Sequence, residues 1–150
     1  MPQSLSRVIL HIVFSTKNRE PWLDPDVRSR MQGYLATVGR DLGAELTHVG
    51  GVADHVHVIS TLPRTMSQAE IVECLKKTSS KWVKTIGAKY RGFSWQRGYS
   101  AFSVSESQLG TLLNYVDSQE EHHRTRTFQE EHRKLLNKHG VHFDERYVWD

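Results

Sequence analysis

The order of its hydrophobic patterns is the feature that most constrains what this chain can fold into. Residues 8–14 form a nearly continuous apolar and β-branched run, interrupted only by His11, which predicts a buried strand. Asp24 and Pro25 are an N-cap residue and a first-turn proline, and the apolar residues behind them recur at helical spacing as far as Leu42. The chain therefore begins with a buried strand and an amphipathic helix.

Two further strand patterns and a second helix pattern come next. Residues 44–49 and 56–62 are predicted strands, and the turn-forming pair Gly50-Gly51 is predicted to join them. Ser67 and Glu70 form a capping box, which predicts the start of the second helix.

The rest of the chain adds one strand region and two helices. Residues 93–104 predict a fourth strand or a hairpin with Arg97-Gly98 as its turn, and helix patterns then cover residues 105–123 and 127–140. The order strand, helix, strand, strand, helix, strand predicts an α+β fold of the ferredoxin-like βαββαβ type. We expect an antiparallel sheet with the first and third strands at its centre, and two additional C-terminal helices.

Composition is that of an ordinary globular chain and excludes several classes. With 37% hydrophobic and 25% charged residues, positions 1–150 are expected to form a single domain. The net charge of +3 permits a nucleic-acid partner without requiring one. The single cysteine, Cys74, excludes an intrachain disulfide framework and a CxxC zinc site. The apolar stretch at residues 8–14 is too short for a signal peptide or membrane span, so we expect a cytoplasmic protein.

Two histidines occupy one face of the third predicted strand. Alternate residues of a strand point to the same side, so His55 and His57 share a face with Ile59. They are either hydrogen-bonded histidines near a strand end or two ligands of a metal site. Because imidazoles are difficult to solvate in the middle of a sheet, a specific purpose for the pair is favoured.

Tyr115 and Gln119 are spaced four residues apart in the penultimate predicted helix, outside its leucine stripe. Such a pair is commonly just an exposed polar face. Beside the histidine strand, however, two imidazoles and one amide oxygen would make a three-ligand divalent-metal site with positions open for substrate. The tyrosine, one helical turn away, is then a candidate nucleophile.

Four stretches of the sequence resemble single-tyrosine HUH transposases of the insertion-sequence type, a single-stranded DNA transposase superfamily that includes the REP-associated tyrosine transposases. These stretches are HIVFSTKNREPWL, DHVH, WQRGYSAFSVS and NYVDSQEEHHRTRTFQEEHRKLLNKHG, and together they span nearly the whole chain. An HUH motif alone is a weak signal, whereas HUH followed by Tyr-x-x-x-Gln and His-His is specific. One departure is Ala53, where relatives often have proline, and it is expected to alter the turn rather than the chemistry.

The resemblance implies roles for four residues and a set of partners. His55 and His57 correspond to metal ligands, Gln119 to the third ligand and Tyr115 to the nucleophile. With Mg²⁺ or Mn²⁺ bound, the tyrosine would cleave single-stranded DNA through a 5′-phosphotyrosine and rejoin the strands, although a histidine-rich site would also accept Zn²⁺ or Ni²⁺. The family further implies binding of terminal DNA hairpins, a bacterial or archaeal cytosol, and a homodimer in which the tyrosine helix completes the partner's site in trans.

Three polar residues near these motifs have two interpretations each. Asp54 either orients an imidazole from behind or caps the turn, and we expect the turn role. His122 is either a solvated histidine, the interpretation we favour, or the acceptor of the Tyr115 proton. His11, on the neighbouring strand, is expected to be a hydrogen-bonded core histidine.

Basic residues supply the candidate DNA contacts. Lys77, Lys81 and Lys84 recur along one face of the second helix and form either a solvated face or a phosphate track. The other candidates flank the predicted site at the ends of the first strand and of the tyrosine helix: Lys17, Arg19, Arg124 and Arg126.

Two alternatives to a mobile-element transposase follow from the same sequence. A domesticated relative that processes repeated palindromic elements would keep the same site, and only genomic context would separate the two. A catalytically inactive ferredoxin-like nucleic-acid-binding module would keep the fold alone. The joint presence of His55, His57, Tyr115 and Gln119 argues against the inactive module.

Overall fold

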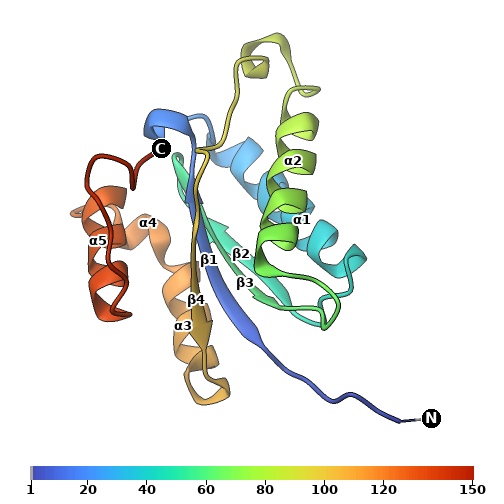
Figure 1. The fold of residues 1–150 in the computed structure, drawn as a ribbon. Helices are drawn as coiled ribbons and strands as arrows, with labels where there is room; N and C mark the ends of the chain where they lie inside the picture. Colours follow the sequence, from blue (N-terminus) through green and yellow to red (C-terminus); the bar gives the residue numbers. More distant parts are fainter. Residues whose placement is uncertain (1) are drawn as a thin grey trace.

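The computed structural model describes residues 2–150 and has the predicted order of strands and helices (Figure 1). Four antiparallel strands form one sheet in the order β2-β3-β1-β4: β1 (Ile9–Ser15), β2 (Thr47–Gly51), β3 (His55–Thr61) and β4 (Ser100–Val104). In the central pair, Val13 of β1 is opposite His57 of β3. The predicted βαββαβ sheet, with its first and third strands at the centre, is confirmed.

Helices cover both faces of the sheet, with α1 and α2 on one side and α3, α4 and α5 on the other (Figure 1). Their bounds are α1 (Pro25–Asp41), α2 (Gln68–Val83), α3 (Leu109–Asp117), α4 (Gln119–His122) and α5 (Phe128–Lys138). Short 3-10 turns lie at Lys17–Arg19, Ala88–Tyr90 and Glu106–Gln108. Within residues 2–150, none of the helices has the length and apolar character needed to cross a bilayer.

The first two helices begin where their caps predict. Asp24 accepts a hydrogen bond from the backbone N–H of Val27 at 3.1 Å, and Pro25 is the first helical residue of α1. Ser67 and Glu70 form the reciprocal capping box at the start of α2. Both signals are local in sequence, which is why they locate the helix starts correctly.

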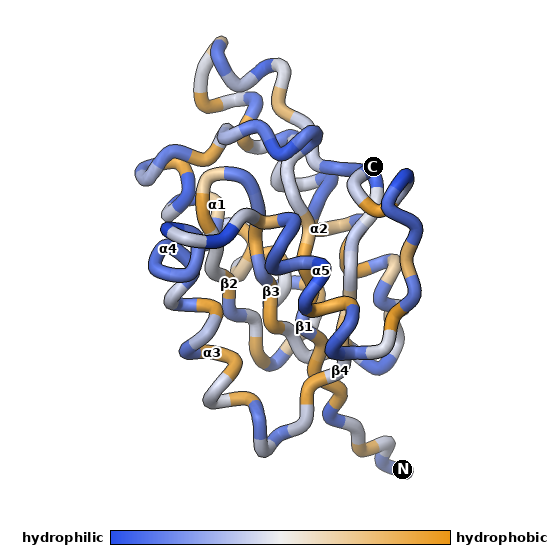
Figure 2. The backbone as a smooth tube through the Cα atoms, turned by 90° about the vertical axis from the view of Figure 1, so that its left-hand side faces the viewer, coloured by the Kyte–Doolittle hydropathy of each residue, from blue (hydrophilic) through white to orange (hydrophobic). Residues whose placement is uncertain are grey.

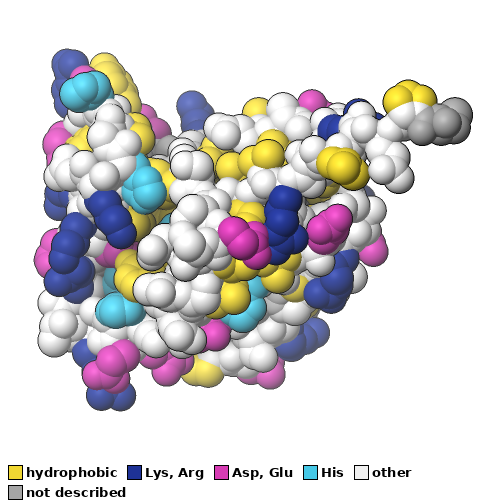
Figure 3. Space-filling view, turned by 90° about the horizontal axis from the view of Figure 1, so that it is seen from below, with side chains coloured by type: hydrophobic (Ala, Val, Ile, Leu, Met, Phe, Trp, Pro, Cys, Tyr) yellow, Lys and Arg dark blue, Asp and Glu magenta, His cyan; other side chains and the backbone are white. Residues whose placement is uncertain are grey.

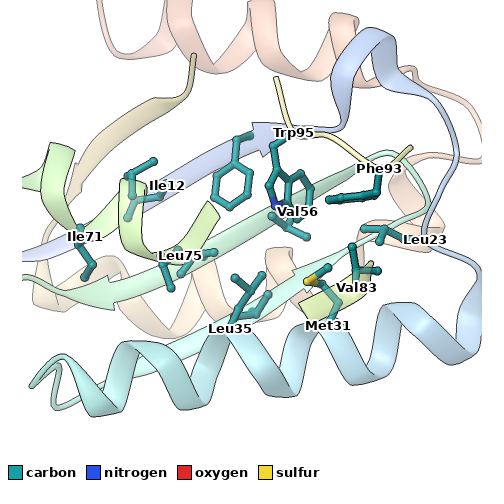
Figure 4. Packing of buried hydrophobic residues seen from close by; sticks show 14 of the residues in the cluster. Ile12, Leu23, Met31, Leu35, Val56, Ile71, Leu75, Val83, Phe93 and Trp95 are labelled. Carbon is teal, nitrogen blue, oxygen red and sulfur yellow. The ribbon is translucent and has the colours of Figure 1, made fainter. Parts of the chain in front are cut away.

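The largest apolar cluster lies between the sheet and the pair α1 and α2 (Figure 4). Alternation along the central strands sends Ile12, Phe14, Val56 and Val58 to this face, where all four are fully buried. The helices contribute Met31, Leu35, Ile71 and Leu75. Burying one such aliphatic side chain contributes about 1.5–3 kcal/mol. This side of the sheet is therefore the main apolar core, and the opposite side of the same strands carries the histidines.

The structure decides one local alternative and corrects one local prediction. The segment 93–104 contributes a single strand, because Trp95 forms an isolated bridge to Thr16 instead of the first strand of a hairpin. Trp95 is buried with its ring edge-on to Phe14, so packing in the core sets the course of this segment. The pair Gly50-Gly51 belongs to the end of β2, and the turn to β3 lies at residues 52–54.

Lys76 fastens α2 to the irregular segment that precedes β4. Its Nζ donates to the carbonyl oxygens of Gln96 at 2.9 Å, of Arg97 at 3.3 Å and of Gly98. Burial lowers the pKa of this amine to about 8. Three carbonyl groups of a segment outside the sheet therefore depend on one side chain.

We expect Lys76→Met to lower the free energy of unfolding by about 1–3 kcal/mol, because three carbonyl groups lose their donor. Lys77→Met, on the exposed face of the same helix, is the matched control and should change stability by less than about 0.5 kcal/mol. The unfolded chain binds the Lys76 proton up to the pKa of a free lysine, 10.5, whereas the folded protein releases it near pH 8. The wild type should therefore gain stability over Lys76→Met as pH rises through this window. Urea denaturation at several pH values measures both effects, and equal stability of all three proteins would contradict them.

Candidate active site and metal centre

His55 and His57 lie on the face of β3 that α3, α4 and α5 cover, and both are completely buried. Nδ1 of His55 is 2.7 Å from Oδ1 of Asp54, and Nδ1 of His57 is 2.7 Å from Nε2 of His11. Because each Nδ1 is engaged from behind, the Nε2 atoms of both rings remain for contacts in front of the strand.

These contacts decide between the interpretations left open for Asp54 and confirm the one expected for His11. Asp54 was expected to serve the turn, but its carboxylate hydrogen-bonds the His55 imidazole and therefore orients that ring. His11 is the buried, hydrogen-bonded histidine that was expected, and its partner is His57. Asp54, next to the HUH motif, and His11, on the neighbouring strand, thus hold the two imidazoles in place.

The helix predicted over residues 105–123 is divided into three pieces. It opens with the 3-10 turn at Glu106–Gln108, and it breaks at Ser118, whose φ and ψ of −100° and 21° are not helical. Oγ of Ser118 donates to the carbonyl oxygen of Asn114 at 2.8 Å, a bond to the preceding turn that favours such bends. Ser105, the predicted cap, instead has its hydroxyl 3.1 Å from that of Ser107.

The break sets which residues after Tyr115 face the histidines. Gln119, now the first residue of α4, is buried with its Oε1 at 3.2 Å from Nε2 of His55 and 3.1 Å from Nε2 of His123. His122, the predicted neighbour, lies beside Tyr115 with 4.7 Å between ring centres. The structure therefore brings Gln119 to His55 as predicted and adds His123, which the sequence reasoning missed.

Glu131 of α5 is the charged residue that the sequence reasoning missed. It is 2% exposed, and its Oε1 lies 3.0 Å from Nε2 of His57, 3.4 Å from Nε2 of His55 and 3.3 Å from Nε2 of His123. Its Oε2 accepts a hydrogen bond from the hydroxyl of Tyr115. Figure 2 shows how α5 reaches the site, since the helix lies in front of β3 and β1.

The position of Glu131 along its helix is a sequence signal that indicates a functional contact. Thr127 caps α5, and the side that packs inward carries Phe128 and Leu136. Glu131 and His132 fall on this inward side, three and four residues after Phe128, and both are buried. Burying a carboxylate is costly unless it has partners, so a glutamate on an apolar stripe indicates a specific contact.

The electrostatics of the cluster depend on burial and on this one carboxylate. Burial raises the pKa of Glu131, but hydrogen bonds from His123 and the two strand histidines outweigh it and hold that pKa far below its usual range. Burial lowers the pKa of His55, yet its hydrogen bonds with Asp54 and Glu131 raise it to about 9. Burial and the negative charge of Glu131 both raise the pKa of Tyr115. In the metal-free site a carboxylate anion therefore faces a neutral phenol.

One metal ion fits between three of these side chains. His55, His57 and Glu131 each offer a ligand atom, and these atoms all lie within 4.8 Å of one another. The amide oxygen of Gln119 is adjacent, at 3.2 Å from Nε2 of His55. Imidazole nitrogens with carboxylate and amide oxygens are a suitable donor set for a divalent cation.

Gly50 allows the tyrosine helix to lie close to the sheet. A Cβ at this position would overlap the carbonyl oxygen of Val116 and lie 2.5 Å from its Cγ1. Val116 is buried and precedes the break by two residues, so the glycine sets how closely α3 packs on β2. This close approach explains why Gly50-Gly51 belongs to a strand and not to the predicted turn.

We expect Gly50→Ala to push α3 away from β2 and to lower the free energy of unfolding by about 1–3 kcal/mol. Gly33→Ala is the matched control, because a Cβ there would point into open space on α1 and should keep or raise stability. Thermal unfolding of the two variants measures the difference. Equal melting temperatures would show that α3 does not need this glycine.

The lysines predicted to form a phosphate track are not near the cluster. Lys77, Lys81 and Lys84 are exposed on α2, across the sheet from Tyr115. Their role in DNA binding stays a prediction, and any contact they make would be remote from the nucleophile.

The other predicted basic residues lie after β1 and after α4. Lys17 and Arg19 belong to the 3-10 turn after β1, and Arg124 follows α4. Arg126 lines a cavity of about 640 Å³ that also contains Tyr115. Of the four, the structure places Arg126 in a common cavity with the predicted nucleophile.

All of the cluster comes from one chain. The tyrosine of α3 and the glutamine of α4 lie against the histidine strand of their own sheet, and α5 of the same chain closes the site. The homodimer and the exchange of the tyrosine helix in trans stay predictions.

A buried HUH pair beside a tyrosine on the same face of a ferredoxin-like sheet defines a single-tyrosine HUH enzyme. The chain belongs to the IS200-like transposase family, whose model matches residues 4–119. This membership confirms the resemblance and makes the protein an enzyme of the class that cleaves DNA and transfers its strands. A curated relative is the ISDra2 transposase TnpA of Deinococcus radiodurans, which is 22% identical over 114 residues, or 73% of this chain and 81% of the relative.

Two solved structures share the fold. One is a candidate transposase from Deinococcus radiodurans R1, with a TM-score of 0.61 and 20% identity over 79% of this chain and 98% of that one. The other is a REP-associated tyrosine transposase bound to a REP hairpin, with a TM-score of 0.55 and 15% identity over 77% of this chain and 68% of that one.

Proposed function

We propose that this protein is a metal-dependent, single-stranded DNA transposase that cleaves DNA with Tyr115. The observation that carries the proposal is the convergence of the Tyr115 hydroxyl, the HUH imidazoles and two side-chain oxygens in one buried cluster. Family membership supplies the reaction class, and the contacts of the cluster indicate which residues perform it.

A divalent cation, Mg²⁺ or Mn²⁺, is the proposed cofactor. His55, His57 and Gln119 would hold it, supported by the convergence of their Nε2 and Oε1 atoms. When bound, it would polarise the scissile phosphate and stabilise the charge that develops on the phosphate oxygens. Asp54 and His11 would keep the two imidazoles oriented from behind.

Tyr115 is the proposed nucleophile. Its oxygen attacks phosphorus and the phosphorus–O3′ bond breaks, which leaves a 5′-phosphotyrosine on one strand and a free 3′-hydroxyl on the other. Glu131 holds the phenolic hydroxyl through its Oε2, the phenolic proton passes to solvent water as the new bond forms, and the leaving 3′-oxygen takes up a proton. Because the phosphotyrosyl bond conserves the energy of the broken linkage, another 3′-hydroxyl can rejoin the strand without ATP.

The cavity of about 640 Å³ between β4, α3 and α5 is the proposed path of the DNA strand. Tyr115 and Glu131 lie in its wall, and Arg126, Lys134 and Lys138 bring positive charge to it. Figure 3 shows Lys, Arg and His side chains beside apolar ones on the side of the molecule that α5 occupies. Cations for phosphates and apolar surface for bases suit an unpaired strand.

Terminal DNA hairpins are the proposed recognition elements, supported by the fold relative that is bound to a REP hairpin. The same relative favours one second candidate function, the processing of repeated palindromic elements by a domesticated enzyme. Either activity would be exercised on DNA in the cytosol. The predicted homodimer can be tested by mixing Tyr115→Phe with His57→Ala subunits, because restored cleavage requires exchange of the tyrosine helix.

The test of the proposed function is a covalent protein–DNA adduct that survives denaturation. The wild-type protein is incubated with end-labelled single strands that carry terminal hairpins, including sequences that flank its own gene. We expect an adduct with single-stranded DNA and Mn²⁺, and none after chelation or with a fully paired duplex. Failure of every hairpin substrate to give an adduct in Mn²⁺ or Mg²⁺ would contradict the proposal.

A further inference from the structure

The two oxygens of the Glu131 carboxylate have different partners. Oε1 faces Nε2 of His57 at 3.0 Å and Nε2 of His55 at 3.4 Å, which are the atoms of the HUH motif left for a metal. Oε2 accepts the hydrogen bond of the Tyr115 hydroxyl. One carboxylate therefore lies between the predicted ligands and the predicted nucleophile.

The three metal ligands that the family resemblance implies carry no negative charge, whereas a hard cation prefers ligands that do. His55, His57 and Gln119 bind metals as neutral groups, whereas Mg²⁺ and Mn²⁺ favour carboxylate oxygens. Glu131 is the acidic residue whose oxygen lies within 4.8 Å of ligand atoms on both HUH histidines. It would bring one negative charge to a set of ligands that is otherwise neutral.

Glu131 is also held in a fixed place. It is 2% exposed, and the turn before it is fixed by the Thr127 cap, whose hydroxyl accepts from the backbone of Glu130 at 3.1 Å. Phe128 packs beside His55 with 4.5 Å between ring centres. This helix lies beyond residues 4–119, the part of the chain that the family model matches. The carboxylate is therefore contributed by a helix outside the matched residues.

We propose that Glu131 has two simultaneous roles, in which Oε1 is a ligand of the metal ion and Oε2 positions the hydroxyl of Tyr115. The inference rests on the proposed function and adds a ligand and positioning residue to it. With both contacts made, the carboxylate would hold the Tyr115 hydroxyl beside the metal-binding side chains before DNA arrives.

A simpler account is that Glu131 only neutralises protonated histidines. The two accounts predict opposite effects of Glu131→Gln on metal affinity. If the carboxylate only stabilises protonated imidazoles, its removal makes them release protons more easily, and Mn²⁺ binds at least as tightly. If the carboxylate is a ligand, the same substitution weakens binding.

The first measurement is Mn²⁺ binding to the purified protein by calorimetry, without DNA. We expect Glu131→Gln to raise the Kd for Mn²⁺ at least about tenfold. Glu130→Gln, the exposed neighbour with the same charge change, should stay within about twofold of the wild type, and so should Tyr115→Phe. Unchanged affinity in Glu131→Gln would overturn the ligand role.

The second measurement is the maximal rate of adduct formation at saturating Mn²⁺, which removes the effect of weakened binding. Glu131→Gln should remain at least about tenfold slower than the wild type, because its hydroxyl partner is no longer held by an anion. A wild-type maximal rate would overturn the positioning role. Melting temperatures in the absence of metal show whether the variant is folded.

Glu131→Asp is a second variant in case the glutamine variant does not fold. It keeps the charge but withdraws the carboxylate by one methylene, so its Mn²⁺ affinity should fall less than its maximal rate. Wild-type values for both would overturn the proposal. A wild-type protein that forms no adduct with any metal would contradict the proposed function itself, whereas normal wild-type activity with unaffected Glu131 variants would contradict this inference alone.

Discussion

Tyr115→Phe is expected to abolish the covalent protein–DNA adduct while leaving the fold intact. Phenylalanine keeps the ring that lies beside His122 and His57, so the packing of α3 against the site is preserved. The substitution removes the only oxygen of this side chain, and with it the bond to phosphorus. We expect adduct formation to fall at least about a thousandfold.

Tyr147→Phe is the matched control for this prediction. Tyr147 is 63% exposed near the C-terminus, and the same loss of one hydroxyl there should leave the adduct unchanged. Denaturing electrophoresis of labelled DNA measures both variants in one experiment, and mass spectrometry of the wild-type adduct locates the modified peptide. Adduct formation by Tyr115→Phe at the wild-type level would identify another nucleophile.

His57→Ala is expected to abolish both Mn²⁺ binding and DNA cleavage. The substitution removes the Nε2 that faces Glu131 at 3.0 Å, and it also deprives His11 of its partner. Losing one of two HUH ligands should weaken Mn²⁺ binding at least about a hundredfold. Calorimetry and the adduct assay measure the two losses independently.

Because His57 is fully buried, its removal also lowers the stability of the fold. A control therefore has to separate this loss of stability from the loss of metal binding. His57→Asn keeps a polar side chain in the same space and should be folded, yet inactive. His142→Ala, at an exposed histidine after α5, should bind Mn²⁺ and form adduct normally. Full cleavage by folded His57→Asn would contradict a role for this histidine in holding the metal.

The sequence predicts those parts of the fold and site that depend on local or periodic signals. Alternation along β3 places His55 and His57 on one face, and the strand order brings that face to the centre of the sheet. The caps at Asp24 and Ser67 start their helices as expected. The spacing of Tyr115 and Gln119 predicts their common orientation, although the helix breaks between them.

The parts of the fold and of the site that the sequence does not predict depend on contacts between distant segments. Glu131 is 74 residues from His57 in the chain, and its role becomes visible only when α5 packs on the sheet. His123 continues the four-residue spacing of Tyr115 and Gln119, but its contact with Glu131 depends on the packing of α5. The course of residues 93–99 is set by the burial of Trp95. Helical spacing places Glu131 on the inward side of α5, but its partners on β3 and α3 are set by the packing of these elements.

The two faces of the sheet differ in the amino-acid substitutions that they tolerate. Apolar side chains fill the side covered by α1 and α2, and polar contacts of the active site occupy the side covered by α3, α4 and α5. Cores tolerate many volume-conserving apolar substitutions, whereas polar networks with every group engaged do not. Thermostability could therefore be evolved or engineered in the α1 and α2 layer with little effect on DNA chemistry. Changes of substrate or metal would have to arise on the other side of the same four strands.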